Sequence, residues 1–510
     1  MPTLLRLVRR AARGRITRVV LVALLLALAG VPVTAAAQPE APLADTAKRA
    51  DWATVQALLR QGADVDAPQG DGSTALHWAS YWDNREIATL LIRAGTDVDA
   101  TNDLGVTPLW AACENGSSAM VLILLESGAD PDVALPFGET PLLTAARSGN
   151  ADVVSQLLAS GADVDAATEA GANGEQTALM WAVAQQHPAV VEVLLAHGAN
   201  VDARSTTFTE TVKTIPTYAN YGLQCVPRNE CYITEVESGG FTPLLFAARV
   251  GDLGSARLLV AAGADVNDAA PDGASVLAVS ALSGHGAVGA FLLAQGADPN
   301  PAEGDYAPLH AAILQRDRTL AEALLSAGAN PNARVSASTR YTRDSADFFF
   351  PPWFVRAPAF WLAARHREAG IMRLLARYGA NPLATHSPEY WTTDRRSAAG
   401  RMWVDEGDTT ALMAAVGLGG RDPLWVVDHR ARVAEATELG RLHDRRDAEA
   451  ATLDAVKVAV ELGVDVNAVN ARGQTAVGAA MDDGFEGVVA FLVERGAALP
   501  DARNTTPRRR

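Results

Sequence analysis

Residues 140–166 read TPLLTAARSGNADVVSQLLASGADVDA. Thr140 can cap a helix, and Pro141 suits the first turn, where the missing N–H of proline costs no hydrogen bond. Leucine and alanine then form a short apolar face that ends at Gly149, a residue suited to a left-handed helix end. A second apolar helix runs up to Gly161 and is followed by a polar turn. Neither helix is long enough to be stable alone, so such units must stack on one another.

The same pattern returns along almost the whole chain, at steps close to 33 residues. Helix starts of this type, most of them Thr-Pro-Leu or Thr-Ala-Leu, begin at Thr74, Thr107, Thr140, Thr177, Thr242, Ala307, Thr410 and Thr475, with weaker copies at Ser275 and Ala357. The closing turns begin at Gly62, Gly95, Gly128, Gly161, Gly198, Gly263, Gly296, Gly328, Gly379, Gly463 and Gly496. A recurrence of this period indicates a solenoid.

The pattern resembles the ankyrin repeat, in which Thr-Pro-Leu-His opens the first of two helices and Gly-Ala-Asp-x-Asn follows the second. The resemblance covers about residues 45–500. It implies an all-α ankyrin-repeat solenoid of about eleven helix-turn-helix units, the first only half a unit, with hairpin fingers between units and several long insertions. Ankyrin arrays bind other proteins, so the resemblance also implies a protein or peptide partner on the finger or concave surface.

Irregular spacing between the closing turns locates the insertions. The step is 33 residues at first and then grows to 65 after Gly198, 51 after Gly328 and 84 after Gly379. The resulting division is a leader (1–37), repeats (45–203), an insertion (204–239), repeats (240–333), an insertion (334–356), a repeat (357–384), an insertion (385–407), repeats (408–500) and a disordered tail (501–510). Within the last block a further insertion, 418–452, separates the two helices of one unit, and residues 430–451 are predicted to form an extra charged helix.

The first three insertions lie where the ankyrin family has its fingers, so they should project from one edge of the array. They are rich in aromatic residues. Two interpretations remain open, because these side chains either pack on the array as a small core of their own or stay exposed for a partner. The candidate partner-binding residues are Tyr218, Tyr221, Phe348, Phe349, Phe350, Trp353, Phe354, Tyr390 and Trp391.

Residues 1–37 have the features of a secretory signal peptide. Six arginines precede an apolar run from Val19 to Gly30, and Ala35–Ala37 offers a small-residue cleavage site. The rival interpretation is an uncleaved membrane anchor, since the uncharged stretch approaches the length of a spanning helix. Cleavage would leave a bacterial-looking periplasmic or secreted protein with no stable membrane insertion.

The chain is acidic, which disfavours nucleic-acid partners. Its formal charge is −16 and becomes −22 without the six arginines of the leader. Such a surface repels phosphate backbones.

The three cysteines divide into two groups. Cys113 lies within an apolar helix and is expected to be a buried small residue. Cys225 and Cys231 share the first insertion, and the oxidising compartment implied by the leader allows them to form a disulfide. The alternative is that the two thiols bind a metal ion, but a structural zinc site requires four ligands and these cysteines supply two.

Histidines and aspartates of the repeats are expected to be structural. His77 and His310 occupy the Thr-Pro-Leu-His position, where the family resemblance implies that they brace turns. The recurring aspartates suit turns, since their carboxylates accept from nearby backbone N–H groups. Calcium is disfavoured because these residues recur one repeat apart instead of within one loop. We therefore expect neither a metal nor another cofactor.

The sequence contains no nucleophile elbow, no zinc-protease helix motif and no P-loop. The sequence thus predicts a non-enzymatic interaction scaffold outside the cytoplasm. The alternatives are a structural or protective protein of the cell envelope that stabilises an exported partner, and a secreted effector.

Overall fold

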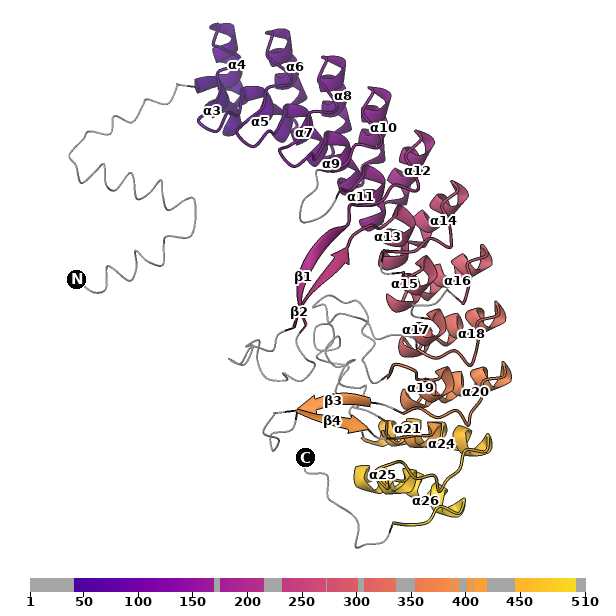
Figure 1. Cartoon of the computed structure of the whole chain (residues 1–510). Helices are drawn as coiled ribbons and strands as arrows, with labels where there is room; N and C mark the ends of the chain where they lie inside the picture. The colour runs from indigo at the N-terminus through magenta and orange to yellow at the C-terminus, as the bar shows by residue number, and fades with distance from the viewer. Residues whose placement is uncertain are drawn as a thin grey trace, which may run out of the picture. The chain divides into compact units, whose positions relative to one another are not determined.

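A computed structural model describes residues 41–168, 175–214, 232–271, 273–300, 307–335, 354–387, 389–393, 401–405, 407–419 and 445–500 (Figure 1). The predicted leader and tail lie outside these ranges, as do large parts of the insertions. The chain divides into two compact units, one extending to Pro136 and the other beginning at Phe137.

Within the described residues, the first unit contains three helix pairs. They are α3 (Pro42–Lys48) with α4 (Trp52–Arg60), α5 (Ala75–Tyr81) with α6 (Arg85–Arg93), and α7 (Pro108–Glu114) with α8 (Ser118–Glu126). The first pair is complete, whereas the sequence predicted only half a unit starting near residue 45. Its first helix escaped detection because it has no capping threonine, but Leu43, Ala44 and Ala47 bury the expected apolar face.

The part of the second unit that the structure describes contains eight pairs and two β-hairpins. Consecutive first helices pack together, and so do consecutive second helices. The pairs are α9 (Pro141–Ser148) with α10 (Ala151–Ala159), α11 (Ala178–Ala184) with α12 (Pro188–Ala196), α13 (Pro243–Val250) with α14 (Leu253–Ala261), α15 (Val276–Leu282) with α16 (Gly286–Ala294), α17 (Pro308–Leu314) with α18 (Arg318–Ser326), α19 (Ala359–Arg365) with α20 (Ala369–Arg377), α21 (Ala411–Ala415) with α24 (Arg445–Glu461), and α25 (Ala476–Asp483) with α26 (Glu486–Glu494).

The α9–α10 pair shows how the sequence produces a unit. Thr140 Oγ1 accepts a hydrogen bond from the Leu143 amide at 3.3 Å and so caps α9. Gly149 ends that helix with φ 81°, and Asn150 caps α10 through a 3.1 Å bond from the Val153 amide. Each cap satisfies a backbone donor that the helix leaves unpaired. The apolar faces of both helices are then buried, so the predicted helix-turn-helix unit is confirmed.

Side-chain oxygens in the closing turns connect successive repeats. Asp66 accepts from the backbone amide of Asp97 at 3.0 Å, and Asp99 accepts from that of Asp130 at 3.0 Å. In the second unit, Asn300 accepts in the same way from Asn330 at 2.7 Å. The recurring aspartates and asparagines therefore serve the turns, as predicted, and also tie each turn to the next.

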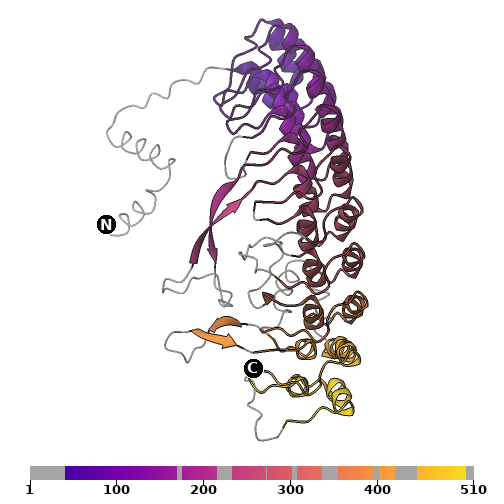
Figure 2. The same cartoon turned by 45° about the vertical axis from the view of Figure 1, so that its right-hand side comes forward.

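Two insertions contain antiparallel hairpins, which the repeat pattern did not predict. Strand β1 (Phe208–Thr214) pairs with β2 (Tyr232–Ser238), with Phe208 opposite Ser238. Strand β3 (Glu389–Thr393) pairs with β4 (Arg401–Asp405). Figure 2 shows both hairpins leaving the edge of the second unit from which its fingers project. This arrangement agrees with the expectation that the insertions lengthen fingers.

Two helix boundaries differ from the sequence prediction. The weak copy assigned to residues 357–360 is displaced by one residue. Pro358 occupies the N-cap position of α19 without making a side-chain cap, and Trp361 therefore occupies the position of His77 in α5. The extra charged helix predicted at residues 430–451 is also different. Its described part, from Arg445 onward, continues into the second helix of the unit as one 17-residue helix, α24.

Candidate functional site

Three aromatic side chains form a cluster at the C-terminal end of α5 in the first unit, one of them half-buried (Trp78) and two exposed (Tyr81 and Trp82). Tyr81 is 53% exposed and Trp82 is 50% exposed. The ring of Tyr81 lies edge-on to both tryptophans, with centroids 5.8 Å from Trp78 and 5.1 Å from Trp82. Large aromatic groups left in water in this way are typical of protein interaction surfaces.

Contacts with neighbouring elements hold the cluster in place. Trp78 Nε1 donates to Gln69 Oε1, in the finger that precedes α5, at 2.9 Å. The ammonium group of Lys48, at the end of α3, lies 4.9 Å from the centroid of the Trp78 ring. Both contacts hold Trp78, and the Tyr81 ring packs edge-on against it. The inner part of the aromatic cluster of Trp78, Tyr81 and Trp82 is thus in place before any partner arrives, which lowers the entropic cost of binding.

The repeat pattern did not point to this cluster, although the sequence of α5 is unusual. Residues 78–82 read WASYW, and no other first helix places aromatic side chains at both positions equivalent to Tyr81 and Trp82. In α7, for example, these positions hold Glu114 and Asn115. Comparing each position across the repeats would have identified the cluster.

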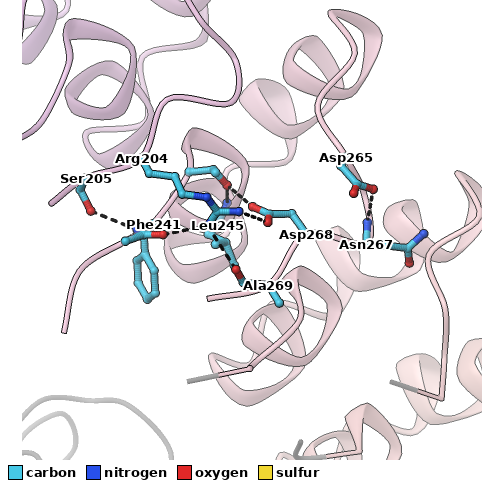
Figure 3. Close-up of polar contacts among 10 residues, drawn as sticks. Arg204, Ser205, Phe241, Leu245, Asp265, Asn267, Asp268 and Ala269 are labelled. Atoms are coloured by element: carbon cyan, nitrogen blue, oxygen red, sulfur yellow. Dashed lines mark hydrogen bonds and ion pairs between the residues drawn. The ribbon is translucent and has the colours of Figure 1, made fainter. Parts of the chain in front are cut away.

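We call the place where the chain enters and leaves an insertion its root. The root of the first insertion is closed by an arginine (Figure 3). The Arg204 guanidinium donates to the carbonyl of Gly240 at 3.0 Å, to that of Ala269 at 3.2 Å, and to the Asp268 carboxylate. Asp268 also accepts from Thr242 Oγ1, the residue that caps α13, at 2.8 Å. The arginine therefore joins the entry and exit of the insertion to the following finger.

Backbone hydrogen bonds close the same root. The Ser205 amide donates to the Phe241 carbonyl at 3.0 Å, and the Gly240 amide returns a bond to Ser205 at 2.9 Å. The Phe241 amide donates to Ser205 Oγ at 3.0 Å. Gly240 has φ 67°, and a Cβ there would lie 2.4 Å from Cγ of Pro271, so both its backbone and its surroundings require glycine.

The root of the second insertion repeats this design with two changes. Arg334, equivalent to Arg204, donates to the carbonyl of Arg356 at 2.8 Å and to that of Thr385 at 3.2 Å. Ala384 stands at the position of Asp268, so the Arg334 guanidinium has no equivalent of that carboxylate. Arg356 has φ 69° at the position that Gly240 occupies in the first root.

The root of the third insertion uses buried rings instead of arginine. His386 and Thr409 exchange backbone hydrogen bonds of 3.0 and 2.8 Å. Trp361, which is fully buried, donates through Nε1 to Thr409 Oγ1 at 3.2 Å, and its ring centroid lies 4.5 Å from that of His386. This root is held by ring packing, by the paired backbones of His386 and Thr409, and by buried side-chain hydrogen bonds of Thr409.

The predicted binding residues fall into three groups. Tyr218, Tyr221, Phe348, Phe349, Phe350 and Trp353 lie outside the described residues, as do Cys225 and Cys231. Tyr390 and Trp391 lie in β3 opposite Val404 and Trp403. Phe354 is described and buried, with its ring 6.3 Å from Trp361 and 5.9 Å from His366, so at this residue the packing interpretation applies.

A family model described as ankyrin repeats, in three copies, matches residues 43–134, 128–205 and 244–335, which together make up half of the chain. The chain belongs to the ankyrin repeat family. A comparison with curated proteins found no match. Repeats beyond residue 335 were not matched, but α19 to α26 form the same kind of helix pairs as the matched ankyrin repeats.

The ankyrin histidines brace the fingers, as the sequence predicted. His77 Nδ1 accepts from the Thr74 amide at 3.1 Å, and Nε2 lies 2.9 Å from the Val106 carbonyl in the next finger. His310 Nε2 reaches the Ala333 carbonyl at 3.1 Å. Burial lowers the pKa of His77, and it lowers that of His310 to about 4, so both rings are neutral at physiological pH.

The remaining candidate features of the described residues are a cysteine, possible metal ligands and possible membrane-spanning helices. Cys113 is buried as predicted, and burial raises the pKa of its thiol, so it is not a reactive group. Among the residues that the structure covers, no three His, Cys, Asp or Glu side chains are placed to hold a metal ion. No helix in the described ranges combines the length and the apolar content that crossing a bilayer requires. Ankyrin repeats generally mediate protein–protein interaction.

Proposed function

We propose that this ankyrin array is a non-enzymatic scaffold that binds a protein or peptide through its fingers and first helices. The observation that carries the proposal is the aromatic cluster of Trp78, Tyr81 and Trp82. Tyr81 and Trp82 are exposed, and they pack beside a half-buried Trp78 that Gln69 and Lys48 hold in place. Tyrosine and tryptophan are the side chains most often found at the energetic centre of a protein interface.

The insertion roots support the same proposal. Arg204 and Arg334 fasten the entry and exit of two long insertions to the next finger. A loop that leaves from a fixed base samples fewer orientations, so less entropy is lost when it docks. The aromatic side chains of the insertions would then add specificity to a surface that is already ordered.

The experiment compares partner capture from an envelope extract by the natural chain and by a Tyr81→Ala/Trp82→Ala variant. Leu122→Ala is the matched control, because Leu122 is a similarly exposed apolar residue of the same unit but belongs to the second helix α8. We expect a partner that the natural chain and the control retain and the double variant loses. Equal capture by all three proteins would contradict a role for the cluster.

A second variant tests the insertions themselves. Residues 348–350 and Trp353 are replaced by Gly and Ser, while Phe354 is kept because its ring is part of the buried root. Loss of the partner with unchanged stability would assign recognition to this insertion. Loss of stability with unchanged capture would instead favour the structural alternative, to which the burial of Phe354 already lends support.

We also propose that the scaffold works outside the cytoplasm, in the periplasm or as a secreted protein. The support is the arginine-rich leader, its apolar run and the cleavage site at Ala35–Ala37. Fractionation of cells followed by N-terminal sequencing tests this. A mature N-terminus shortly after Ala37 in the exported fraction is expected, and an intact leader in the cytoplasm would contradict it.

A further inference from the structure

A groove of about 610 Å³ lies on the second-helix side of the second unit, away from the finger edge. Its walls come from α18, α20 and α24, and Figure 1 shows these helices next to one another along that side. Three arginines line it: Arg318 at the start of α18, and Arg373 and Arg377 on α20. Their side chains are exposed.

The arginines of this groove are only weakly neutralised. Arg377 lies 3.8 Å from a carboxylate oxygen of Glu322, at the limit of an ion pair, and both side chains are largely exposed. Among the described residues, no ion pair or hydrogen bond engages the guanidinium groups of Arg318 and Arg373. Free guanidinium groups collected on one face of an acidic protein present a local site for a negatively charged group.

Small and apolar residues give the groove its shape. Gly370 has no side chain beside Arg318, whose Nη1 and Cδ would lie 3.6 and 3.7 Å from a Cβ at that position. Val458 and Leu462 of the α24 side provide an apolar wall opposite α20, and Glu461 is the one acidic group among the lining residues. The groove therefore combines three cations with an apolar surface.

We propose that this groove binds an acidic peptide segment of a protein partner. Its carboxylates would pair with Arg318, Arg373 and Arg377, and an apolar residue would cover the partly exposed Leu462. Guanidinium groups suit carboxylates because two parallel N–H donors match the two oxygens. The site is distinct from the finger-side surface, so this inference stands or falls independently of the function proposed above.

Charge favours a short acidic segment over a long polyanion. The chain carries a formal charge of −16, and a nucleic acid extending beyond the groove would meet that excess of negative charge. A peptide of a few residues would contact only the arginine cluster.

The test measures binding of a fluorescent twelve-residue peptide in which Asp and Glu alternate with Leu, using the full chain. The groove variant is Arg373→Gln/Arg377→Gln. The control variant, Arg93→Gln/Arg257→Gln, removes the same charge from equivalent positions, since Arg257 is the fifth residue of α14 as Arg373 is of α20, and Arg93 ends α6 as Arg377 ends α20. Circular dichroism checks that both variants remain folded.

We expect the groove variant to bind the peptide at least tenfold more weakly than the natural chain, and the control to stay within twofold. A peptide with Lys in place of each acid should not bind. Equal weakening in both variants, or no binding of the acidic peptide, would overturn the proposal. So would tighter binding of a double-stranded oligonucleotide or of anionic phospholipid vesicles that the groove variant alone loses, because the occupant would then be a polyanion or a membrane.

Discussion

The roots of the first and third insertions perform the same task with different chemistry. At the first, the half-exposed Arg204 joins carbonyls of two segments and the carboxylate of Asp268. At the third, the fully buried Trp361 packs on His386 and donates one hydrogen bond to Thr409. In both cases the stack has to hold two chain ends together before a long loop begins. The two roots therefore both keep a backbone pairing at the base of the finger, although different side-chain interactions stabilise it.

The largest effect is expected at the third root. Trp361→Ala removes a buried indole and its bond to Thr409, which should lower the free energy of unfolding by about 3–5 kcal/mol. Urea denaturation of the natural and variant chains measures this. Trp82→Ala, which truncates a tryptophan that is 50% exposed, serves as the control and should cost much less. Similar losses at the two tryptophans would show that the third root does not depend on burial.

Lowering the pH should destabilise the region around the second and third insertions. The first root should be unaffected, because Arg204 keeps its charge. Burial lowers the pKa of His310 to about 4, and burial together with nearby arginines lowers that of His366 to about 3. Since the folded state favours the neutral rings, their contribution is complete above pH 6.5 and falls as the pH drops toward these values. At pH 5 the loss should be on the order of 2 kcal/mol for each histidine.

Urea denaturation at several pH values between 7 and 5 checks this expectation. His366→Leu removes one titrating ring, so the variant should show a smaller decrease in unfolding free energy over the same range. An unchanged pH dependence in that variant would contradict the assignment. Neither histidine contacts Arg204, whose hydrogen bonds should persist throughout the range.

A smaller effect is expected from the arginine that closes the first root. Arg204→Met should lower the unfolding free energy by about 1–2 kcal/mol, because the guanidinium is partly exposed and its acceptors can bind water once it is removed. Arg334→Met should cost less, since that guanidinium has no equivalent of Asp268. Hydrogen exchange of the Gly240 amide reports on the first root directly, and exchange that is no faster in Arg204→Met would argue against its closing role.

The smallest effect is a gain in stability at the second root. Arg356 adopts φ 69°, a left-handed conformation that suits glycine, so Arg356→Gly should raise the unfolding free energy by up to about 1 kcal/mol. Gly240→Ala is the opposite change at the equivalent position, and it should destabilise because the new Cβ would lie 2.4 Å from Pro271. Thermal denaturation compares both, and a loss of stability in Arg356→Gly would show that the arginine side chain has a role of its own.

Much of the fold could be predicted because local chemistry repeats. Thr140, Gly149 and Asn150 specify caps and a turn through interactions within a few residues, and the same residue types recur in unit after unit. The first pair and α19 were harder to predict, since α3 lacks a capping threonine and the N-cap position of α19 is Pro358, one residue later than the pattern suggested. Strands β1 to β4 were missed because their insertions carry no repeat.

The candidate site was less predictable because it depends on residues far apart in the sequence. The sequence directed attention to aromatic residues in the insertions, whereas the exposed aromatic cluster lies on the first helix α5. Arg204 is an ordinary surface arginine in the sequence, and only the fold places it beside Ala269, 65 residues away. The groove of Arg318, Arg373 and Arg377 likewise forms only when three helices of different repeats come together.

Because Ser205 pairs with Gly240 and Phe241 at the base of the first insertion, the stack is already sealed on the inner side of that junction. The length and sequence of what lies beyond it are then free to change without altering the packing of α13 or its neighbours. Each root is therefore a fixed attachment point, and the array can carry loops of different origin at these points. Protein engineers could exchange residues 207–238 for a loop of another specificity while leaving Arg204, Asp268 and the paired backbone untouched.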